Sequence, residues 1–282
     1  MANSVTALLD QAYQQLAAVS DSALLDAEVL LCHCLNKNRS FIRAWPEHQL
    51  TDQQTAEFQD LIAQRQQGVP VAYLTGEREF WSRSFKVNPD VLIPRPDSEL
   101  LIELSLDLLP ANQSNKIIDL GTGSGILAIT LAAERPSSQV IACDLSPAAL
   151  RTAQANAQQL QIDNVSFLTS NWFSAITDRD FDLVISNPPY IDQHDPHLQQ
   201  GDVRFEPDSA LISPENGLQD IRLLADQARQ HLKPGGYLLI EHGYDQQTAV
   251  QALFKRFNYQ QITTHPDYAG NPRVTSGQWS PA

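Results

Sequence analysis

The sequence predicts an α/β fold: a doubly wound, mostly parallel, Rossmann-like sheet of seven strands, preceded by a small helical-bundle domain. Two patterns support the sheet. Apolar runs alternate with amphipathic stretches from about residue 116 onward, as in chains that place helices on both faces of a parallel sheet. A glycine-rich turn also follows the first apolar run. The first 75 residues instead show the 3.6-residue apolar period of helices, which predicts the separate helical domain.

The helical domain, residues 1–75, should contain four to five helices. Apolar residues recur at helical spacing over residues 8–16. We expect Ser20–Ser22 to cap a second helix, Ser40 to cap a short third one and Thr51 to begin a longer one. The bundle is expected to end near Gly68, where Val69 and Pro70 follow.

A β-hairpin connector is predicted over residues 76–94, because two short extended runs flank a turn there. The third segment, residues 95–282, is predicted to form the sheet domain. It should begin with a helix over residues 99–109, capped by Asp97 or Ser98.

The order of elements in this third segment follows from the alternation of patterns. The last two strands have no helix between them, so they should pair as a hairpin. The predicted strands are residues 116–120, 139–143, 165–168, 181–186, 237–241, 259–264 and 273–278, with helices at 127–133, 147–160 and 218–232.

Charge and cysteine content exclude several classes of protein. The 282 residues carry 33 acidic and 19 basic side chains, a net charge of −14, which disfavours a general nucleic-acid binding surface. A basic protein partner suits such a chain better. Three cysteines make no disulfide framework and lack the spacing of zinc ligands. With no apolar run of membrane-spanning length and no charged start of a signal peptide, we expect a cytoplasmic protein that does not bind membranes.

The glycine-rich turn is the first candidate site. Gly121, Gly123 and Gly125 follow the first strand, so a ligand could approach the backbone closely. The spacing differs from the G-x-G-x-x-G of dinucleotide-binding proteins and suits a nucleoside with an amino-acid tail. Asp144 ends the second strand, where its carboxylate could accept hydrogen bonds from ribose hydroxyls.

The tetrapeptide Asn187-Pro188-Pro189-Tyr190 is the second candidate site. It ends the apolar strand at residues 181–186, and ligands of open α/β sheets bind beyond the carboxyl ends of strands. The Asn187 side-chain oxygen and the Pro188 carbonyl could accept hydrogen bonds from a planar NH₂ group. The prolines fix the backbone, and Tyr190 offers a flat face. These groups would hold a weakly nucleophilic nitrogen beside an electrophile.

Together these motifs resemble class I S-adenosylmethionine-dependent methyltransferases that modify a planar nitrogen. The sequences Arg95–Glu99 and Val203–Pro207, with the helical domain and connector, resemble more narrowly the protein-glutamine N5-methyltransferases of peptide chain release factors. The resemblance spans essentially the whole chain. It implies transfer to the glutamine of the Gly-Gly-Gln loop of class 1 release factors, supporting translation termination, by a monomeric enzyme whose helical domain helps to dock the factor.

The resemblance also implies roles for individual residues. The cofactor would contact Gly121, Thr122, Gly123, Ser124, Gly125, Asp144, Trp172 and Asn187. Catalysis would depend on Asn187, Pro188 and Tyr190. The substrate would contact Asn187, Pro188, Pro189, Tyr190, Arg95 and Glu99. For Trp172 a core position, and for Arg95 and Glu99 an ion pair at helical spacing, are the structural alternatives.

Three other functions remain as alternatives. An adenine N6 or guanine N2 methyltransferase of nucleic acids could use the same tetrapeptide, but residues 1–94 carry 7 basic against 11 acidic side chains. The sequence lacks the glycine spacing of a dinucleotide-dependent oxidoreductase, which disfavours that function. The intact Asn187 argues against a cofactor-binding scaffold without catalysis. We expect no metal at His194 and His197, and we expect Glu241 and His242 to be a packed or solvated strand end.

Overall fold

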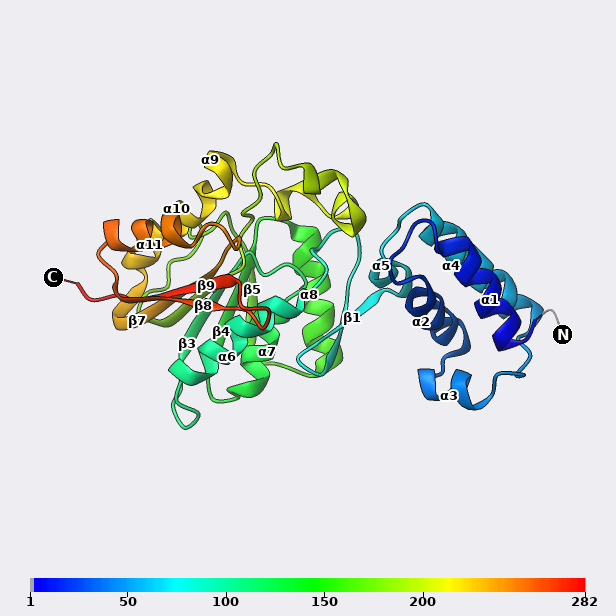
Figure 1. The fold of residues 1–282 in the computed structure, drawn as a ribbon. Helices are drawn as coiled ribbons and strands as arrows, with labels where there is room; N and C mark the ends of the chain where they lie inside the picture. Colours follow the sequence, from blue (N-terminus) through cyan, green and yellow to red (C-terminus); the bar gives the residue numbers. More distant parts are fainter. Residues whose placement is uncertain (1–2, 282) are drawn as a thin grey trace. The chain divides into compact units, whose positions relative to one another are not determined.

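The computed structural model describes residues 3–281 and contains two compact units (Figure 1). The first unit comprises the chain up to Glu77 together with the distant segment Gln199–Phe205. The second comprises Arg78–Leu198 and the chain from Glu206 onward. The sequence pattern places a boundary near residue 75 but gives no sign that a segment near residue 200 belongs with the helices.

The first unit is a bundle whose helices bury one apolar core. Leu16, Leu30 and Phe58 are among its most buried side chains. The helices are α1 (Val5–Leu16), α2 (Ala23–Leu35), α3 (Arg39–Ala44), α4 (Asp52–Gln66) and α5 (Val71–Thr75). Five helices match the upper end of the predicted number.

The helix caps in this unit only partly follow the prediction. Thr51 begins α4 in a capping box with Gln54, as its sequence suggests. The third helix is capped by Asn38, whose side chain accepts a hydrogen bond from the Phe41 amide, so the prediction of Ser40 is wrong. Ser22 precedes α2 without a side-chain cap bond, since its backbone (φ −113°, ψ 30°) is not in the extended conformation of a cap, and its hydroxyl donates to Asp26.

Arg65 fixes the inserted segment Gln199–Phe205 within the first unit. Its Nε donates to Asp26 at 2.8 Å and its Nη1 donates to Asp202 at 3.0 Å, with further bonds to the Gly68 and Val69 carbonyls. The Arg65 side chain is only 11% exposed, so these bonds compensate for the burial of its charge. The 3₁₀ turn η3 (Gly201–Phe205) therefore belongs to the packing of the helical unit.

The second unit is built on a seven-stranded sheet in the order β5-β4-β3-β6-β7-β9-β8. The first five strands run parallel and β9 pairs antiparallel with β7 and β8, so the predicted terminal hairpin is present. The strands are β3 (Lys116–Leu120), β4 (Gln139–Asp144), β5 (Val165–Thr169), β6 (Phe181–Ser186), β7 (Leu232–Glu241), β8 (Gln260–Pro266) and β9 (Pro272–Gln278). A separate two-stranded sheet, β1 (Glu77–Phe80) and β2 (Arg83–Lys86), forms the predicted connector hairpin.

Helices cover both faces of the large sheet (Figure 1). On one face α6 (Glu99–Leu108), α7 (Ile126–Glu134) and α8 (Pro147–Leu160) pack against alternate strand residues such as Ile117 and Leu183. On the other face α10 (Gln219–Gln227) and α11 (Gln247–Arg256) pack against Ile118 and Val184. Because both faces are buried, the central strands are apolar throughout, as the sequence indicated.

The start of β7 is the clearest difference from the predicted elements. We expected a helix through Leu232, but α10 ends at Gln227, the 3₁₀ turn η5 (Ala228–Gln230) follows, and Leu232 already pairs with Phe181 of β6. The pairing is irregular between Phe181 and Leu183, which accommodates Pro234-Gly235-Gly236 within the strand. Within residues 3–281, the structure contains no helix long and apolar enough to cross a membrane.

Candidate active site

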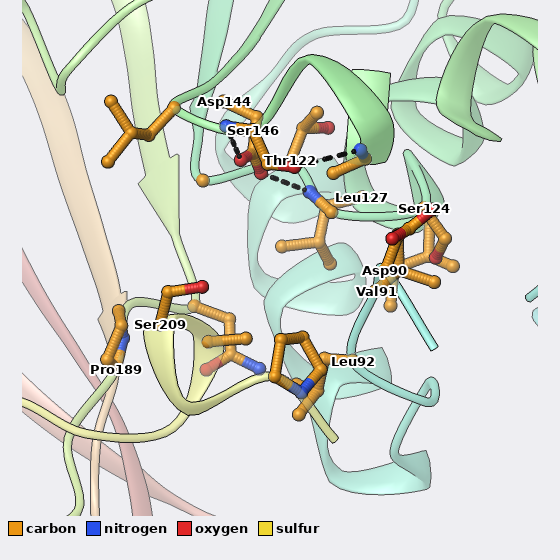
Figure 2. A pocket seen from close by; sticks show the side chains of 18 of the residues that line it. Asp90, Val91, Leu92, Thr122, Ser124, Leu127, Asp144, Ser146, Pro189 and Ser209 are labelled. Carbon is orange, nitrogen blue, oxygen red and sulfur yellow. Dashed lines mark hydrogen bonds between the residues drawn. The ribbon is translucent and has the colours of Figure 1, made fainter. Parts of the chain in front are cut away.

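The strand order places the candidate site at the switch point between β3 and β6. From β3 the chain proceeds outward to β4 and β5, then returns to β6 on the other side of β3. The carboxyl ends of β3 and β6 therefore diverge into connections on opposite sides, which leaves a crevice. A cavity of about 350 Å³ lies there, lined by both predicted motifs, by the connector around Leu92 and by the 3₁₀ turn η4 (Asp208–Ala210) (Figure 2).

The turn after β3 has positive φ at Gly121, Gly123 and Gly125, a backbone conformation that favours glycine at all three. Gly121 has φ +76°, and a Cβ there would lie 3.3 Å from the Trp172 ring. Gly125 has φ +86° at the start of α7, where a Cβ would lie 2.6 Å from Ile129. At Gly123, by contrast, a Cβ would meet none of the described atoms within 4 Å. The backbone at Gly123 is therefore open to a ligand in the cavity.

Asp144, at the end of β4, is held by the backbone of two turns. Its Oδ2 accepts from the Gly123 amide at 2.9 Å and its Oδ1 accepts from the Ser146 amide at 2.8 Å (Figure 2). Burial raises the pKa of this carboxyl, while the backbone amides that donate to it oppose the shift. Each carboxylate oxygen keeps a further lone pair, so Asp144 can still accept hydrogen bonds from a ligand.

Asp119, the fourth residue of β3, holds the glycine-rich turn through hydrogen bonds, a role that was not predicted from the sequence. Its Oδ2 accepts from the Thr122 hydroxyl at 2.6 Å and from the Ala128 amide at 3.2 Å. Its Oδ1 has no hydrogen-bond partner among the described residues. Burial raises the pKa of this carboxyl to about 7, although the two hydrogen bonds oppose the shift. Thr122 therefore turns its hydroxyl toward Asp119 rather than into the cavity.

Trp172 lines the cavity just after β5 and has a fixed orientation. Its Nε1 donates to Asp220 at 3.1 Å, and its six-membered ring lies over Gly121. Its backbone has φ +48°, an uncommon value for a bulky residue. The side chain is also partly buried against one of the two sheet cores. Trp172 therefore has both of the positions that the sequence allowed, one in the core and one at the cavity.

Of the tetrapeptide after β6, Asn187 and Pro189 line the cavity and Pro188 is buried. Tyr190 is anchored at two points. Its hydroxyl donates to Glu241 at 3.3 Å, and its carbonyl accepts from Gln246 at 3.0 Å. Burial and the nearby Glu241 carboxylate both raise the pKa of Tyr190, so its phenol stays protonated.

Ser98 lies beside Asn187 and differs from its predicted role as a helix cap. Its side chain makes no cap bond to α6. Its hydroxyl donates to Glu241 Oε2 at 2.7 Å and accepts from Asn187 Nδ2 at 3.1 Å. The expected cap bond is therefore absent, because Ser98 has helical backbone angles at the end of η1 and its hydroxyl accepts from Asn187 instead.

Arg95 and Glu99 lie in different surroundings. Arg95 lines the cavity and donates to the carboxylate of the buried Glu206, which also accepts from the Ile93 amide at 2.9 Å. Glu99 accepts from the Trp81 amide at 2.9 Å, and it is not among the described residues that line the cavity. Arg95 therefore pairs with Glu206, and Glu99 accepts from the Trp81 amide, in place of the ion pair with each other that was the structural alternative. A substrate contact of Glu99 stays a prediction.

The remaining candidate groups have local partners. His197 Nδ1 lies 2.7 Å from Asp195 in an exposed loop. The ring of the buried His242 bonds to the Gly243 carbonyl and to the Thr275 hydroxyl, each at 2.8 Å. Within residues 3–281 there is no group of three or more His, Cys, Asp or Glu side chains arranged to hold a metal ion.

Comparison with known proteins agrees with this arrangement. A family model described as PrmC N-terminal domain matches residues 7–76, and one described as methyltransferase small domain matches residues 97–203. The release factor glutamine methyltransferase of Shewanella oneidensis is 51% identical over 96% of this chain and 94% of its own length. That of Escherichia coli is 49% identical over 96% and 97%. The chain belongs to the release factor glutamine methyltransferase family.

Solved structures show the same fold at low identity. A methyltransferase from Pyrococcus furiosus matches with a TM-score of 0.55 and 14% identity, covering 82% of this chain and all of that one. A 16S rRNA methyltransferase from T. thermophilus, solved in complex with AdoMet and guanosine, matches with a TM-score of 0.53 and 18% identity over 72% of this chain and 49% of that one. These structures share the Rossmann-like sheet that the sequence predicts. That the chain is a methyltransferase follows from its relatives and from the methyltransferase family model.

Proposed function

We propose that this enzyme transfers a methyl group from S-adenosylmethionine to the side-chain amide nitrogen, N5, of the glutamine in the Gly-Gly-Gln loop of class 1 peptide chain release factors. One observation carries the proposal. In a chain that matches release factor glutamine methyltransferases over nearly its whole length, the Asn187 amide and the glycine-rich turn line the same cavity. An acceptor nitrogen and a bound cofactor can therefore meet there.

The cavity suits this cofactor. S-adenosylmethionine supplies a methyl group that is already activated on a sulfonium, so the protein must mainly bind and orient the reactants. The open backbone at Gly123 admits a ligand, and the Asp144 carboxylate would accept from the ribose hydroxyls. Trp172, held by Asp220, would lie against the adenine. The other proposed cofactor contacts are Gly121, Thr122, Ser124, Gly125 and Asn187.

The acceptor amide would be held by the tetrapeptide. Asn187 Oδ1 and the Pro188 carbonyl would accept the two N–H bonds of the glutamine, which aims the nitrogen toward the methyl carbon. The anchored Tyr190 and Pro189 would bound the planar amide. Arg95 lines the cavity and would lie at its substrate side. No side chain needs to remove the amide proton before transfer in this arrangement, since positioning localises the nitrogen lone pair.

Several properties of the whole molecule belong to the same proposal. The helical domain would help to dock the release factor, and its net negative charge suits a basic protein partner. We propose that the enzyme is a cytoplasmic monomer that supports translation termination and does not contact nucleic acid or membranes directly.

The test is methyl transfer from labelled S-adenosylmethionine to a purified class 1 release factor. A second release factor, with the loop glutamine replaced by alanine, is the matched control. We expect label on the natural factor and none on the control. Equal label on both would contradict the glutamine as acceptor. Label on DNA or RNA under the same conditions, with none on the factor, would support the nucleic-acid alternative instead.

A further inference from the structure

Behind Asn187 lies a short chain of hydrogen bonds that joins three distant elements. Asn187 Nδ2 donates to Ser98 Oγ at 3.1 Å, and Ser98 Oγ donates to Glu241 Oε2 at 2.7 Å. Ser98 ends the 3₁₀ turn η1 (Pro96–Ser98), and Glu241 ends β7. Ser98 and Glu241 are each 1% exposed, so water does not compete for these bonds.

The carboxylate of Glu241 decides which groups donate and which accept along this series of hydrogen bonds. An ionised carboxylate can only accept hydrogen bonds, and Glu241 accepts from Ser98 on one oxygen and from the Tyr190 hydroxyl on the other. The single hydroxyl hydrogen of Ser98 is therefore engaged, so Ser98 can only accept from Asn187. The side-chain atom of Asn187 that faces Ser98 must then be its NH₂ group. Its oxygen is left for the cavity.

The surroundings of Glu241 bear on its charge. Burial raises the pKa of Glu241, and the neighbouring Asp97 adds to this shift. The hydrogen bonds donated by Ser98 and Tyr190 and the positive charge of Arg273, from β9, oppose it and favour the carboxylate. Arg273 in turn lies 3.4 Å from Asp97 and 3.3 Å from Asp267, so it is held beside Glu241 by two further carboxylates.

We propose that Ser98 and Glu241 are positioning residues that fix the orientation of the Asn187 amide and thereby make the site selective for glutamine over glutamate. The inference rests on the proposed function. With its oxygen in the cavity, Asn187 matches the NH₂ group of glutamine and repels a carboxylate. If the amide rotated by half a turn, its NH₂ group would point into the cavity and would match the carboxylate of glutamate instead.

The matched pair Ser98→Thr and Ser98→Val tests this directly. Threonine and valine have nearly the same shape, but only threonine keeps the hydroxyl that donates to Glu241 and accepts from Asn187. We expect S98V to turn over the natural release factor at least about ten-fold more slowly than S98T, since one oriented hydrogen bond is worth about that much. The Kd for S-adenosylmethionine should be the same in both variants, because Ser98 acts on the acceptor side.

The second readout is selectivity, which a purely structural role would not change. A release factor with the loop glutamine replaced by glutamate serves as a competitive inhibitor. S98V should be inhibited by it more strongly, relative to its KM for the natural factor, than S98T is. Glu241→Met, which removes the acceptor while leaving Ser98 in place, should shift kcat and inhibition in the same direction as S98V.

The outcomes separate this inference from the function on which it rests. If the wild-type enzyme labels the natural factor while S98T and S98V have equal kcat and equal inhibition by the glutamate factor, the positioning role is wrong and the proposed function stands. Failure of the wild-type enzyme to label the factor would refute the function itself. If S98V does not bind S-adenosylmethionine, the same comparison is made between Glu241→Met and Glu241→Gln, where glutamine retains an acceptor for Ser98.

Discussion

The glycine-rich part of the cofactor side is built from residues close in sequence, whereas the acceptor side is assembled from distant segments. Asp119, Gly123 and Asp144 lie within two successive strands and their turns, and backbone amides make most of their bonds. On the acceptor side, Asn187 depends on Ser98, and Ser98 depends on a carboxylate 143 positions away. Hydrogen bonds between side chains, rather than bonds to backbone amides, hold the acceptor side in place.

This difference has a consequence for mutation. Backbone amides stay in place when a side chain is replaced, so the cofactor side should lose its bonds one at a time. The acceptor side is a connected network, in which the loss of one member changes the orientation of the next. We therefore expect substitutions on the two sides to change different measured quantities.

Replacing Asn187 with alanine should separate the two sides most clearly. It removes an acceptor aimed at the reacting nitrogen, and losses of that kind lower kcat by about 10²–10³-fold. Because Asn187 lies beyond β6 rather than on the glycine-rich turn, the Kd for S-adenosylmethionine should stay within a few-fold of the wild-type value. Single-turnover methylation and equilibrium binding measure the two quantities. A large loss of cofactor affinity with unchanged turnover would place Asn187 on the other side.

Asp144→Ala should have the reverse effect. Without the carboxylate, the ribose loses its charge-assisted hydrogen bonds, so cofactor binding should weaken by about 1–3 kcal/mol and the Kd should rise accordingly. At saturating cofactor, kcat should change little, since the acceptor side is intact. Calorimetric titration provides the Kd, and Asp163→Ala, a carboxylate after α8, is the matched control. An unchanged Kd would remove Asp144 from the cofactor site.

Asp119→Asn tests the buried carboxyl beneath the glycine-rich turn through its pH dependence. The folded-state pKa is raised to about 7 from an ordinary value of 3.8. The folded protein therefore binds this proton more tightly than the unfolded chain does. The contribution of Asp119 to stability is fully present below about pH 4 and is lost as pH rises through about 7.

Asparagine has no such titration, so the free energy of unfolding of the variant relative to wild type should increase between pH 5 and pH 8. We expect an increase of about 2–3 kcal/mol, because the wild type loses about 1.4 kcal/mol per pH unit between pH 5 and the folded pKa of about 7; urea unfolding at both pH values measures it. Asp107→Asn, in α6, controls for a general effect of removing one negative charge. A difference that is the same at both pH values would show that Asp119 is ionised throughout this range.

Trp172→Phe should have the smallest effect. Phenylalanine keeps an aromatic face but loses the hydrogen bond to Asp220, which fixes the ring over Gly121. We expect the cofactor Kd to rise about two- to five-fold, in line with one modest hydrogen bond. Trp45→Phe, at a tryptophan that is 62% exposed in the helical unit, is the control. If both variants bind the cofactor equally well, the orientation of Trp172 does not matter for binding.

Much of the fold could be predicted from the sequence because its elements carry strong local patterns. The apolar strands β3 and β6 and the helix α8 begin and end at the predicted residues. The cap at Asn38 and the absence of a side-chain cap bond from Ser98 could not be predicted, since neighbouring polar residues compete for the same positions. The start of β7 was also missed, because Pro234-Gly235-Gly236 has the pattern of a loop although the strand continues through it.

The sequence by itself determined the class of chemistry. Glycine spacing, the acid after the second strand and the Asn-Pro-Pro-Tyr tetrapeptide are local signals, and the strand order then brings them to one switch point. Only the tertiary structure decided which partners orient these groups. The contacts between Ser98 and Glu241 and between Trp172 and Asp220 join residues 143 and 48 positions apart. No local pattern encodes such pairs, because hydrogen bonds between side chains depend on where the packed sheet and helices place them.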